Sequence, residues 1–269
     1  MCGIVGYVGP NSCADLLVDG LRRLEYRGYD SAGLAVFDGK KVDVVRAVGK
    51  LQNLVKALRE HPLEGNLGIG HTRWATHGRP TEVNAHPHVA GNIALVHNGI
   101  IENHIELKRQ LSESGVKFTS DTDTEIVAHL IHRELNQGAP SLFEAVRRSL
   151  RRVVGAYGIA VVSRTEPDVV VAARHGSPLV VGLGQDEMLC GSDIPALLAH
   201  TRDMIFLEDG DIVELKAKGY RIESVSGDKV ERRVKRIDWS VVQAEKSGYK
   251  HFMLKEIHEQ PRAIEDTMR

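Results

Sequence analysis

The chemistry of this chain begins at its second residue, a cysteine that becomes N-terminal once the initiator Met1 is removed. Such a residue carries both a thiol and a free α-amine. A thiol with a pKa of about 8.5 is only slightly ionised at neutral pH, so it needs a base to act as a nucleophile. The α-amine titrates at about 7.7 to 8.0, so it can take the thiol proton and later protonate a leaving amine. Cys2 can therefore supply nucleophile and base; the alternative is a small buried side chain.

The other two cysteines, Cys13 and Cys190, fall in apolar patterns that predict a helix and a strand. We expect both to be buried and structural. Three cysteines without a CxxC spacing argue against a disulfide framework and against a structural zinc site. At least one thiol must then be free, as a reactive Cys2 requires.

A polar segment at 71–78, HTRWATHG, directly follows a predicted buried strand. The planar guanidinium of Arg73 suits bidentate recognition of a carboxylate, and Trp74 beside it could form a wall or a lid. The alternative is a surface arginine beside a packed tryptophan.

Four histidines in this region raise the question of a metal site. Their spacing matches neither HExxH nor HxH on a rigid element with an acidic third ligand. We therefore expect no metal and no cofactor, and we expect these side chains to make local hydrogen bonds in a polar loop. The four are His71, His77, His86 and His88.

Two further short motifs each allow a chemical and a structural interpretation. In HNG at 97–99, the amide of Asn98 and the N–H of Gly99 could point two donors at one oxyanion, although Asn-Gly is also the commonest turn dipeptide. In DTDTE at 121–125, Asp123 could bind a substrate ammonium group. Alternatively, Asp121 or Asp123 could cap the helix that follows.

The elements that position these residues are predicted from hydrophobic periodicity. The strand–helix–strand order indicates an α+β layered domain and not a βαβ repeat. Asp38-Gly39 and Asp209-Gly210 are typical of hairpin turns. We predict strands over 2–8, 31–37, 42–48, 67–73 and 92–97, helices over 13–25, 50–59, 102–114, 123–136 and 141–152, and further short strands from 156 onward.

The composition is that of an ordinary globular protein, with 269 residues of which 42% are hydrophobic and 26% charged. Lys plus Arg total 35 against 36 for Asp plus Glu, so there is no excess of positive charge to attract nucleic acid or an anionic membrane. No apolar run reaches the roughly 18 residues needed to span a bilayer, and the first residues do not have the pattern of a signal peptide. We expect a cytoplasmic protein with neither nucleic acid nor membrane as a partner.

Taken together and in order, the motifs resemble the class II glutamine amidotransferases of the N-terminal nucleophile hydrolase superfamily. Within that family they are most similar to the glutaminase domains of glutamine–fructose-6-phosphate aminotransferases. The resemblance extends over essentially the whole chain. It is carried by CGIVGY at 2–7, LRRLEYRGYDSAG at 21–33, GHTRWATHG at 70–78, NAHPH at 84–88, VHNGIIENH at 96–104, SDTDTE at 120–125, GAYG at 155–158, GSPLVVGLG at 176–184 and FLEDGDI at 206–212.

The resemblance implies a four-layer αββα sandwich that hydrolyses the side-chain amide of L-glutamine. It implies that Cys2 is the nucleophile and that Asn98 and Gly99 form the oxyanion hole. Arg73 would pair with the α-carboxylate of glutamine and Asp123 with its α-ammonium group. The remaining implied site residues are Trp74, Thr76 and His77, in a loop that closes over glutamine, and Arg27 and Gly28, in a supporting role.

The resemblance also divides the chain into a glutaminase domain over 2–222 and a linker over 223–269. That linker would lead toward a sugar-phosphate isomerase domain outside this chain, which binds fructose 6-phosphate, and the full-length enzyme would be a homodimer. Three alternatives stay open: an amidotransferase with another acceptor, such as phosphoribosyl pyrophosphate; a binding domain with a degenerate site; and a metalloprotein built on the histidines.

Overall fold

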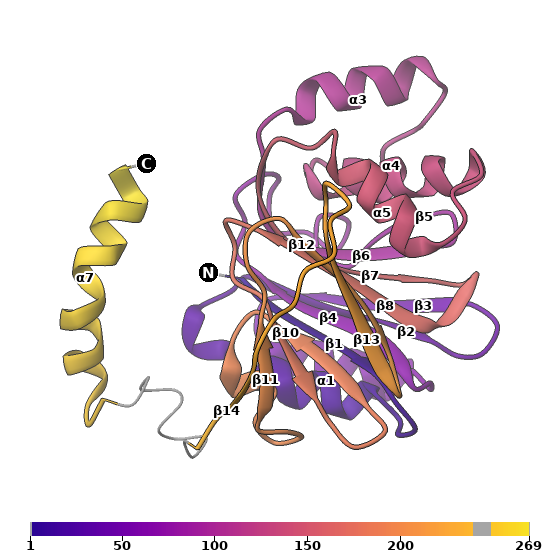
Figure 1. Ribbon diagram of the computed structural model, residues 1–269. Helices are drawn as coiled ribbons and strands as arrows, with labels where there is room; N and C mark the ends of the chain where they lie inside the picture. The colour runs from indigo at the N-terminus through magenta and orange to yellow at the C-terminus, as the bar shows by residue number, and fades with distance from the viewer. Residues whose placement is uncertain (1, 239–248, 269) are drawn as a thin grey trace.

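Two β-sheets stacked face to face form the centre of the protein (Figure 1). The computed structural model describes residues 2–238 and 249–268. One sheet has eight strands in the order β14-β11-β9-β10-β1-β4-β2-β3, and the other has six in the order β13-β12-β8-β7-β6-β5. The strand bounds are β1 Gly3–Val8, β2 Ser31–Phe37, β3 Val42–Val48, β4 Leu67–Arg73, β5 His88–Ala90, β6 Ile93–Ile101, β7 Gly155–Ser163, β8 Glu166–His175, β9 Val180–Leu183, β10 Met188–Gly191, β11 Asp203–Phe206, β12 Asp211–Lys216, β13 Gly219–Ser224 and β14 Val234–Arg236.

Helices cover the outer face of each sheet. Helices α1 (Ala14–Arg22) and α2 (Leu51–Glu60) pack on the eight-stranded sheet, and α3 (His104–Glu113), α4 (Thr124–Asn136) and α5 (Leu142–Leu150) lie on the side of the six-stranded sheet (Figure 1). Buried apolar side chains fill three layers, one under each helical layer and one between the sheets. The predicted α+β four-layer sandwich is confirmed.

The predicted elements agree with the observed ones to within a few residues, with one shift that concerns the site. The helix predicted over 13–25 ends at Arg22, and a 3₁₀ turn, η1 (Glu25–Arg27), follows it. Gly28 then reverses the chain with φ of +75°, a conformation that favours glycine. A Cβ at this position would lie 2.4 Å from the Trp74 ring, so a larger residue would clash with the tryptophan.

Two turn predictions are wrong, for different reasons. The strand predicted to end before Asn98-Gly99 continues through both residues to Ile101, because β6 keeps its pairing with β7 along this stretch. Asp209-Gly210 does turn the chain, but it is not a hairpin. The strands on either side of it, β11 and β12, belong to different sheets and pair with β9 and β8.

The two sheets extend into the segment predicted as a linker. β13 ends at Ser224, and β14 pairs with β11 at the edge of the eight-stranded sheet. Residues 249–268 include helix α7 (Phe252–Met268), which Figure 1 draws to one side of the sheets. A short 3₁₀ turn, η2 (Ile194–Ala196), precedes β11.

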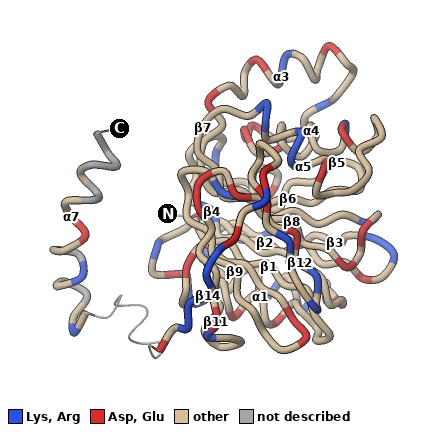
Figure 2. Tube along the Cα trace, viewed as in Figure 1, with Lys and Arg blue, Asp and Glu red and all other residues tan. Residues whose placement is uncertain are grey.

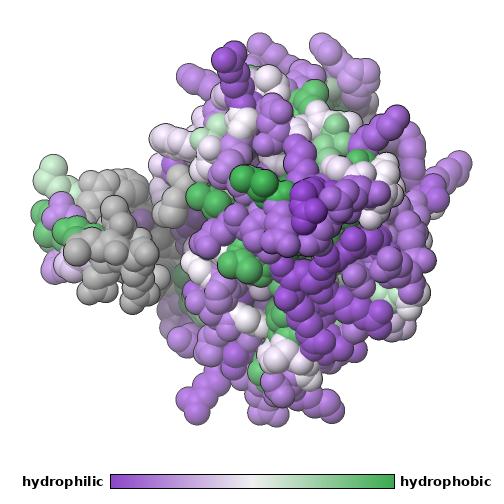
Figure 3. Space-filling view, turned by 90° about the horizontal axis from the view of Figure 1, so that it is seen from above, coloured by the Kyte–Doolittle hydropathy of each residue, from purple (hydrophilic) through white to green (hydrophobic). Residues whose placement is uncertain are grey.

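Charge and hydropathy are distributed without a dominant patch in the views drawn. Figure 2 shows basic and acidic residues interspersed along the chain, in line with the near-zero net charge. Figure 3 shows one face of the molecule, on which hydrophobic surface is confined to small separate areas. Among the described residues, no helix is both long enough and apolar enough to cross a membrane.

Candidate active site

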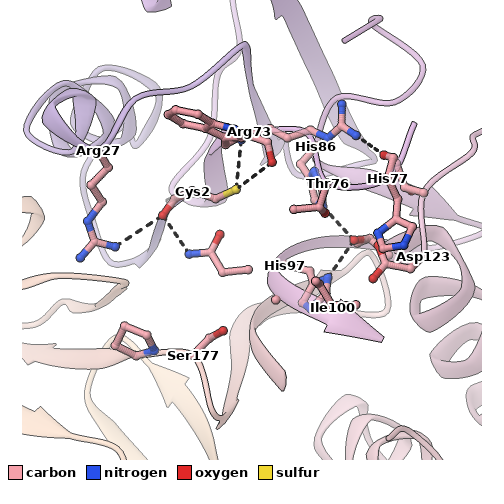
Figure 4. Close-up of a pocket in the computed structure, with 16 residues that line it drawn as sticks. Cys2, Arg27, Arg73, Thr76, His77, His86, His97, Ile100, Asp123 and Ser177 are labelled. Atoms are coloured by element: carbon pink, nitrogen blue, oxygen red, sulfur yellow. Dashed lines mark hydrogen bonds between the residues drawn. The ribbon is translucent and has the colours of Figure 1, made fainter. Parts of the chain in front are cut away.

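A cavity of about 380 Å³ opens where the layer between the sheets ends (Figure 4). Nine of the ten residues predicted for the site line it, and Gly28, the tenth, lies behind Trp74. Several lining residues were not predicted. The full lining is Cys2, Arg27, Arg73, Trp74, Thr76, His77, His86, His97, Asn98, Gly99, Ile100, Thr122, Asp123, Thr124, Ser177 and Pro178.

Strand alternation explains why these side chains meet. In β4, Ile69 packs between the sheets, so His71 and Arg73 point the same way. In β6, Val96 packs into the same layer and Asn98 follows it on that side. The apolar stripes of two different sheets thus end in polar residues at the same place, and these residues form one wall of the cavity.

Cys2 precedes β1, and its thiol lies under the backbone of Trp74. The Sγ atom accepts a hydrogen bond from the Trp74 N–H at 3.0 Å and contacts the Trp74 carbonyl oxygen at 3.5 Å (Figure 4). Burial raises the pKa of the Cys2 thiol, and the Trp74 amide only partly offsets this. The thiol therefore stays protonated at neutral pH and requires a base for nucleophilic attack.

Asn98 and Gly99, the two predicted oxyanion donors, line the cavity together with Cys2. The Asn98 Nδ2 group donates to the Cys2 carbonyl oxygen at 3.1 Å, which places the amide beside the thiol-bearing residue. Gly99 has φ of +136°, and a Cβ on it would lie 2.0 Å from the Ala156 carbonyl oxygen. The β6–β7 pairing therefore admits only glycine at this position.

Arg73 lines the cavity and also holds the adjoining loop. Its Nη2 donates to the carbonyl oxygens of His77 and of Gly78, the latter at 3.0 Å. The loop is held from the other side by Asp30, whose Oδ2 accepts from the Ala75 N–H at 2.5 Å. These two contacts shape the loop that carries Trp74, Thr76 and His77 to the cavity, with Trp74 more than half exposed.

Asp123 is the N-cap residue of α4, yet its side chain makes no capping hydrogen bond. Instead its Oδ2 accepts from the Ile101 N–H at 2.8 Å, which ties the start of α4 to the end of β6. No hydrogen bond to the other carboxylate oxygen, Oδ1, is found within the described part of the chain. The carboxylate is buried and lines the cavity, so it presents negative charge there.

The segment before α4 is held instead by Glu125, which was not singled out from the sequence. Its carboxylate accepts from the backbone N–H and the hydroxyl groups of Thr119 and Ser120 at 2.7 to 2.8 Å. Burial alone would raise the pKa of Glu125, but His129 and these donors outweigh it and hold the pKa below its usual range. Four donors thus fix the turn that leads into Asp123. The Thr122-x-x-Glu125 spacing, typical of a capping box, is the signal that could have revealed it.

We expect Glu125→Gln to destabilise the fold by about 1 to 3 kcal/mol, because the neutral amide replaces a charged acceptor of several hydrogen bonds. Since the folded-state pKa lies below the unfolded value of about 4.3, this stabilisation is present above that pH and is lost as the pH falls. Urea unfolding at neutral pH and at about pH 4 measures both effects. Glu113→Gln, which removes an exposed ion pair with Arg109, should change stability by less than about 0.5 kcal/mol. An equal loss of unfolding free energy in the two variants would contradict the role of Glu125.

Four histidines, His71, His86, His88 and His97, form a buried, neutral cluster. Burial lowers the pKa of His71 and of His88 to about 3, and it also lowers the pKa values of His86 and His97. The Thr124 hydroxyl lies 3.0 Å from His86 Nε2 and 2.9 Å from His97 Nδ1, so it links the two rings (Figure 4). Within the described residues, no group of three or more His, Cys, Asp or Glu side chains is arranged to hold a metal ion.

Arg27 reaches the site from η1 and is held by a residue that the sequence did not indicate. Its Nη1 contacts the Cys2 carbonyl oxygen at 3.5 Å (Figure 4), and its Nη2 is 2.6 Å from the Asp193 carboxylate. Asp193 also accepts a hydrogen bond from the Tyr26 hydroxyl. Cys2 is thus braced from the segment that follows β10, the strand next to β1 in the eight-stranded sheet.

Comparison with known proteins gives consistent matches. A family model described as a glutamine amidotransferase domain matches residues 71–199. Two curated relatives, the glutamine–fructose-6-phosphate aminotransferases (isomerizing) of Thermus thermophilus and Symbiobacterium thermophilum, are 54% and 53% identical over 270 residues. Each match covers all of this chain but 44% of the relative, so the chain spans less than half the length of these proteins.

Solved structures agree with the sequence matches. A glutamine phosphoribosylpyrophosphate amidotransferase from B. subtilis has a TM-score of 0.71 at 27% identity, covering 85% of this chain and 50% of that one. A structure described as the allosteric regulatory enzyme of purine biosynthesis has a TM-score of 0.72 at 28% identity, covering 83% of this chain and 49% of that one. With its motifs, its sandwich fold and these relatives, the chain belongs to the class II glutamine amidotransferases, the family that its sequence predicts.

Proposed function

We propose that this chain hydrolyses the side-chain amide of L-glutamine, with Cys2 as the N-terminal nucleophile. The observation that carries the proposal is that Cys2 and the Asn98 amide meet at one cavity, with Nδ2 of Asn98 3.1 Å from the Cys2 carbonyl oxygen. A nucleophile beside a fixed hydrogen-bond donor is the arrangement that acyl transfer requires.

The reaction proceeds through a thioester. Once Met1 is removed, the α-amine takes the thiol proton, and the Cys2 sulfur attacks Cδ of glutamine. The carbonyl oxygen becomes an oxyanion, which the Asn98 amide and the Gly99 N–H stabilise. The C–N bond breaks as the ammonium donates its proton to the leaving group, which departs as ammonia. Water, deprotonated by the same amine, then attacks the γ-glutamyl thioester and releases glutamate and the free thiol.

Two charged residues at the cavity give specificity for an amino acid. Arg73 would bind the α-carboxylate of glutamine, since its fork matches a carboxylate. Its Nη2 donates to the loop, whereas Nη1 makes only a long contact of 3.5 Å with the Arg79 carbonyl oxygen. Asp123 would bind the α-ammonium through the carboxylate oxygen that does not accept from Ile101. Trp74, Thr76 and His77 would close over the substrate from the 73–77 loop, and Arg27 and Gly28 would support the N-terminal residue and Trp74.

Asp123→Asn should raise KM for glutamine by about 10- to 100-fold with a smaller effect on kcat, because a charge-assisted hydrogen bond is worth about 1.5 to 3 kcal/mol. The asparagine carbonyl can still accept from Ile101, so the fold should persist. The matched control is a substrate, 4-carbamoylbutanoate, which is glutamine without its amino group. For this analogue, the KM of the variant should be close to that of the wild type. An equal rise in KM for both substrates would show that Asp123 acts on the fold and not on the ammonium.

We further propose that the ammonia released here serves the synthesis of glucosamine 6-phosphate from fructose 6-phosphate. The support is the name and the 53–54% identity of the curated relatives. Residues 2–222 would be the glutaminase domain and 223–269 the connection to an acceptor domain, which would correspond to the remaining length of those relatives. The homodimer and the cytoplasmic location stay predictions from the sequence.

The direct test is the product balance with glutamine as the only substrate. We expect the protein with a free Cys2 amine to release ammonia and glutamate in equal amounts, and to act poorly on asparagine. Failure to release either product would overturn the proposed function. A different result is that the chain releases both products while the acceptor domain joined to it uses phosphoribosyl pyrophosphate and not fructose 6-phosphate. That result would overturn only the proposed acceptor.

A further inference from the structure

One buried histidine contacts the proposed oxyanion donor but has no part in the reaction described above. His71 lies in β4 and is fully buried. Its Nε2 atom is 2.9 Å from Oδ1 of Asn98 and 3.0 Å from the carbonyl oxygen of His97. The contact joins the two sheets, because β4 belongs to the eight-stranded sheet and β6 to the six-stranded one.

The His97 carbonyl fixes the tautomer of His71. A carbonyl oxygen can only accept, so the nitrogen that faces it must carry a hydrogen. Burial lowers the pKa of His71 to about 3, so the ring is neutral at working pH and carries only that one hydrogen. The ring is held in place by stacking on His86, with centroids 4.1 Å apart and an interplanar angle of 29°. The Nε2–H of His71 is therefore a fixed donor in a rigid position.

A fixed donor at this point decides which way the Asn98 amide faces. An asparagine amide has two orientations of nearly equal shape, which exchange its oxygen and its nitrogen. With Oδ1 toward the His71 donor, Nδ2 points to Cys2, as observed. The flipped amide would place its own N–H against the Nε2–H of His71, and it would present an oxygen to the developing oxyanion. Such a flip would remove a stabilising donor and add repulsion at the reacting atom.

We propose that His71 is a positioning residue that holds the Asn98 amide in the orientation able to donate to the oxyanion. The inference rests on the proposed function, since it assigns His71 a role in that same reaction. His71 does not touch the substrate, and it acts only through Asn98.

Three substitutions separate this role from simple packing. Leucine removes the donor, asparagine places an amide at the position of Nδ1, and glutamine is long enough to bring a nitrogen near the position of Nε2. We expect His71→Leu and His71→Asn to lower kcat by about 10- to 100-fold, the range typical of residues that orient a catalytic group, with KM for glutamine nearly unchanged. His71→Gln should restore most of kcat. The rate at which iodoacetamide alkylates Cys2 should stay the same in all three, because that reaction forms no oxyanion.

The decisive comparison repeats His71→Asn in an Asn98→Ala background. Because His71 acts through Asn98, the double variant should be no slower than Asn98→Ala alone. His88→Leu is the matched control, since it removes an equally buried imidazole that hydrogen-bonds Thr122 and not Asn98. It should leave kcat near the wild-type value. Should the leucine variant not fold, the glutamine and asparagine variants still give the comparison.

The inference is overturned if His71→Asn leaves kcat unchanged, or if His71→Gln and His71→Asn lower kcat equally. It is also overturned if His71→Asn lowers kcat in the Asn98→Ala background by as much as it does alone. The wild-type rate separates this failure from failure of the proposed function. A wild-type protein with a free Cys2 amine that releases no ammonia overturns both, whereas an active wild type with an unaffected His71→Asn variant overturns only the role of His71.

Discussion

Replacing Cys2 with alanine should abolish glutamine hydrolysis while leaving the fold intact. Loss of a catalytic nucleophile lowers kcat by about a millionfold in a well-studied protease, and no other described cysteine can substitute here. Cys13 and Cys190 are fully buried in apolar surroundings, and burial raises the pKa of each thiol to about 12. Ammonia release from glutamine measures the effect, and the alanine variant should fall below detection.

Cys13→Ala is the matched control for this experiment. It removes a buried sulfur from the start of α1, so it should lower stability slightly and leave kcat unchanged. Substantial ammonia release by Cys2→Ala would contradict the assignment of the nucleophile. Equal loss of activity in both variants would point to damage to the fold instead.

Asn98→Ala should lower kcat by about 100- to 1000-fold, with a small effect on KM for glutamine, because it removes one donor that acts mainly in the transition state. Asn98 accepts from His71 and donates to the Cys2 carbonyl oxygen, so alanine also leaves the His71 donor without its side-chain partner. Steady-state kinetics with glutamine gives kcat and KM separately.

Asn103→Ala is a suitable control, since it changes another asparagine of the same sequence motif. The Asn103 side chain donates to the Arg152 carbonyl oxygen and accepts from the Val154 N–H, away from the cavity. We expect it to lower stability by about 1 kcal/mol and to leave kcat unchanged. Near-normal kcat in Asn98→Ala would exclude Asn98 as an oxyanion donor.

Much of the fold followed from local patterns in the sequence. Short apolar segments located strands such as β1 and β4, and helical spacing located α4 and α5, within a few residues of their observed bounds. The failures occurred where pairing between strands overrides a local signal. Asn98-Gly99 is typical of a turn, but hydrogen bonds to β7 carry the strand through it, and Asp209-Gly210 joins strands of two different sheets.

The site shows the same limit. Residues in continuous motifs, such as Arg73 and Asn98, could be named from the sequence and line one cavity. The contacts that support them could not be predicted, because they join residues that are separated along the chain. Asp193 braces Arg27 from 166 residues away, and His71 meets Asn98 across the two sheets. Such contacts are created by the stacking of the sheets and leave no local pattern.

The central claim is that Cys2 works as an N-terminal residue whose own amine is the base. Its most direct test measures ammonia release from glutamine by protein samples whose N-terminal mass has been determined. Protein without Met1 should be active, and protein that retains Met1 should be folded but essentially inactive, because its Cys2 nitrogen is part of a peptide bond. Equal activity per molecule in the two forms would contradict the claim.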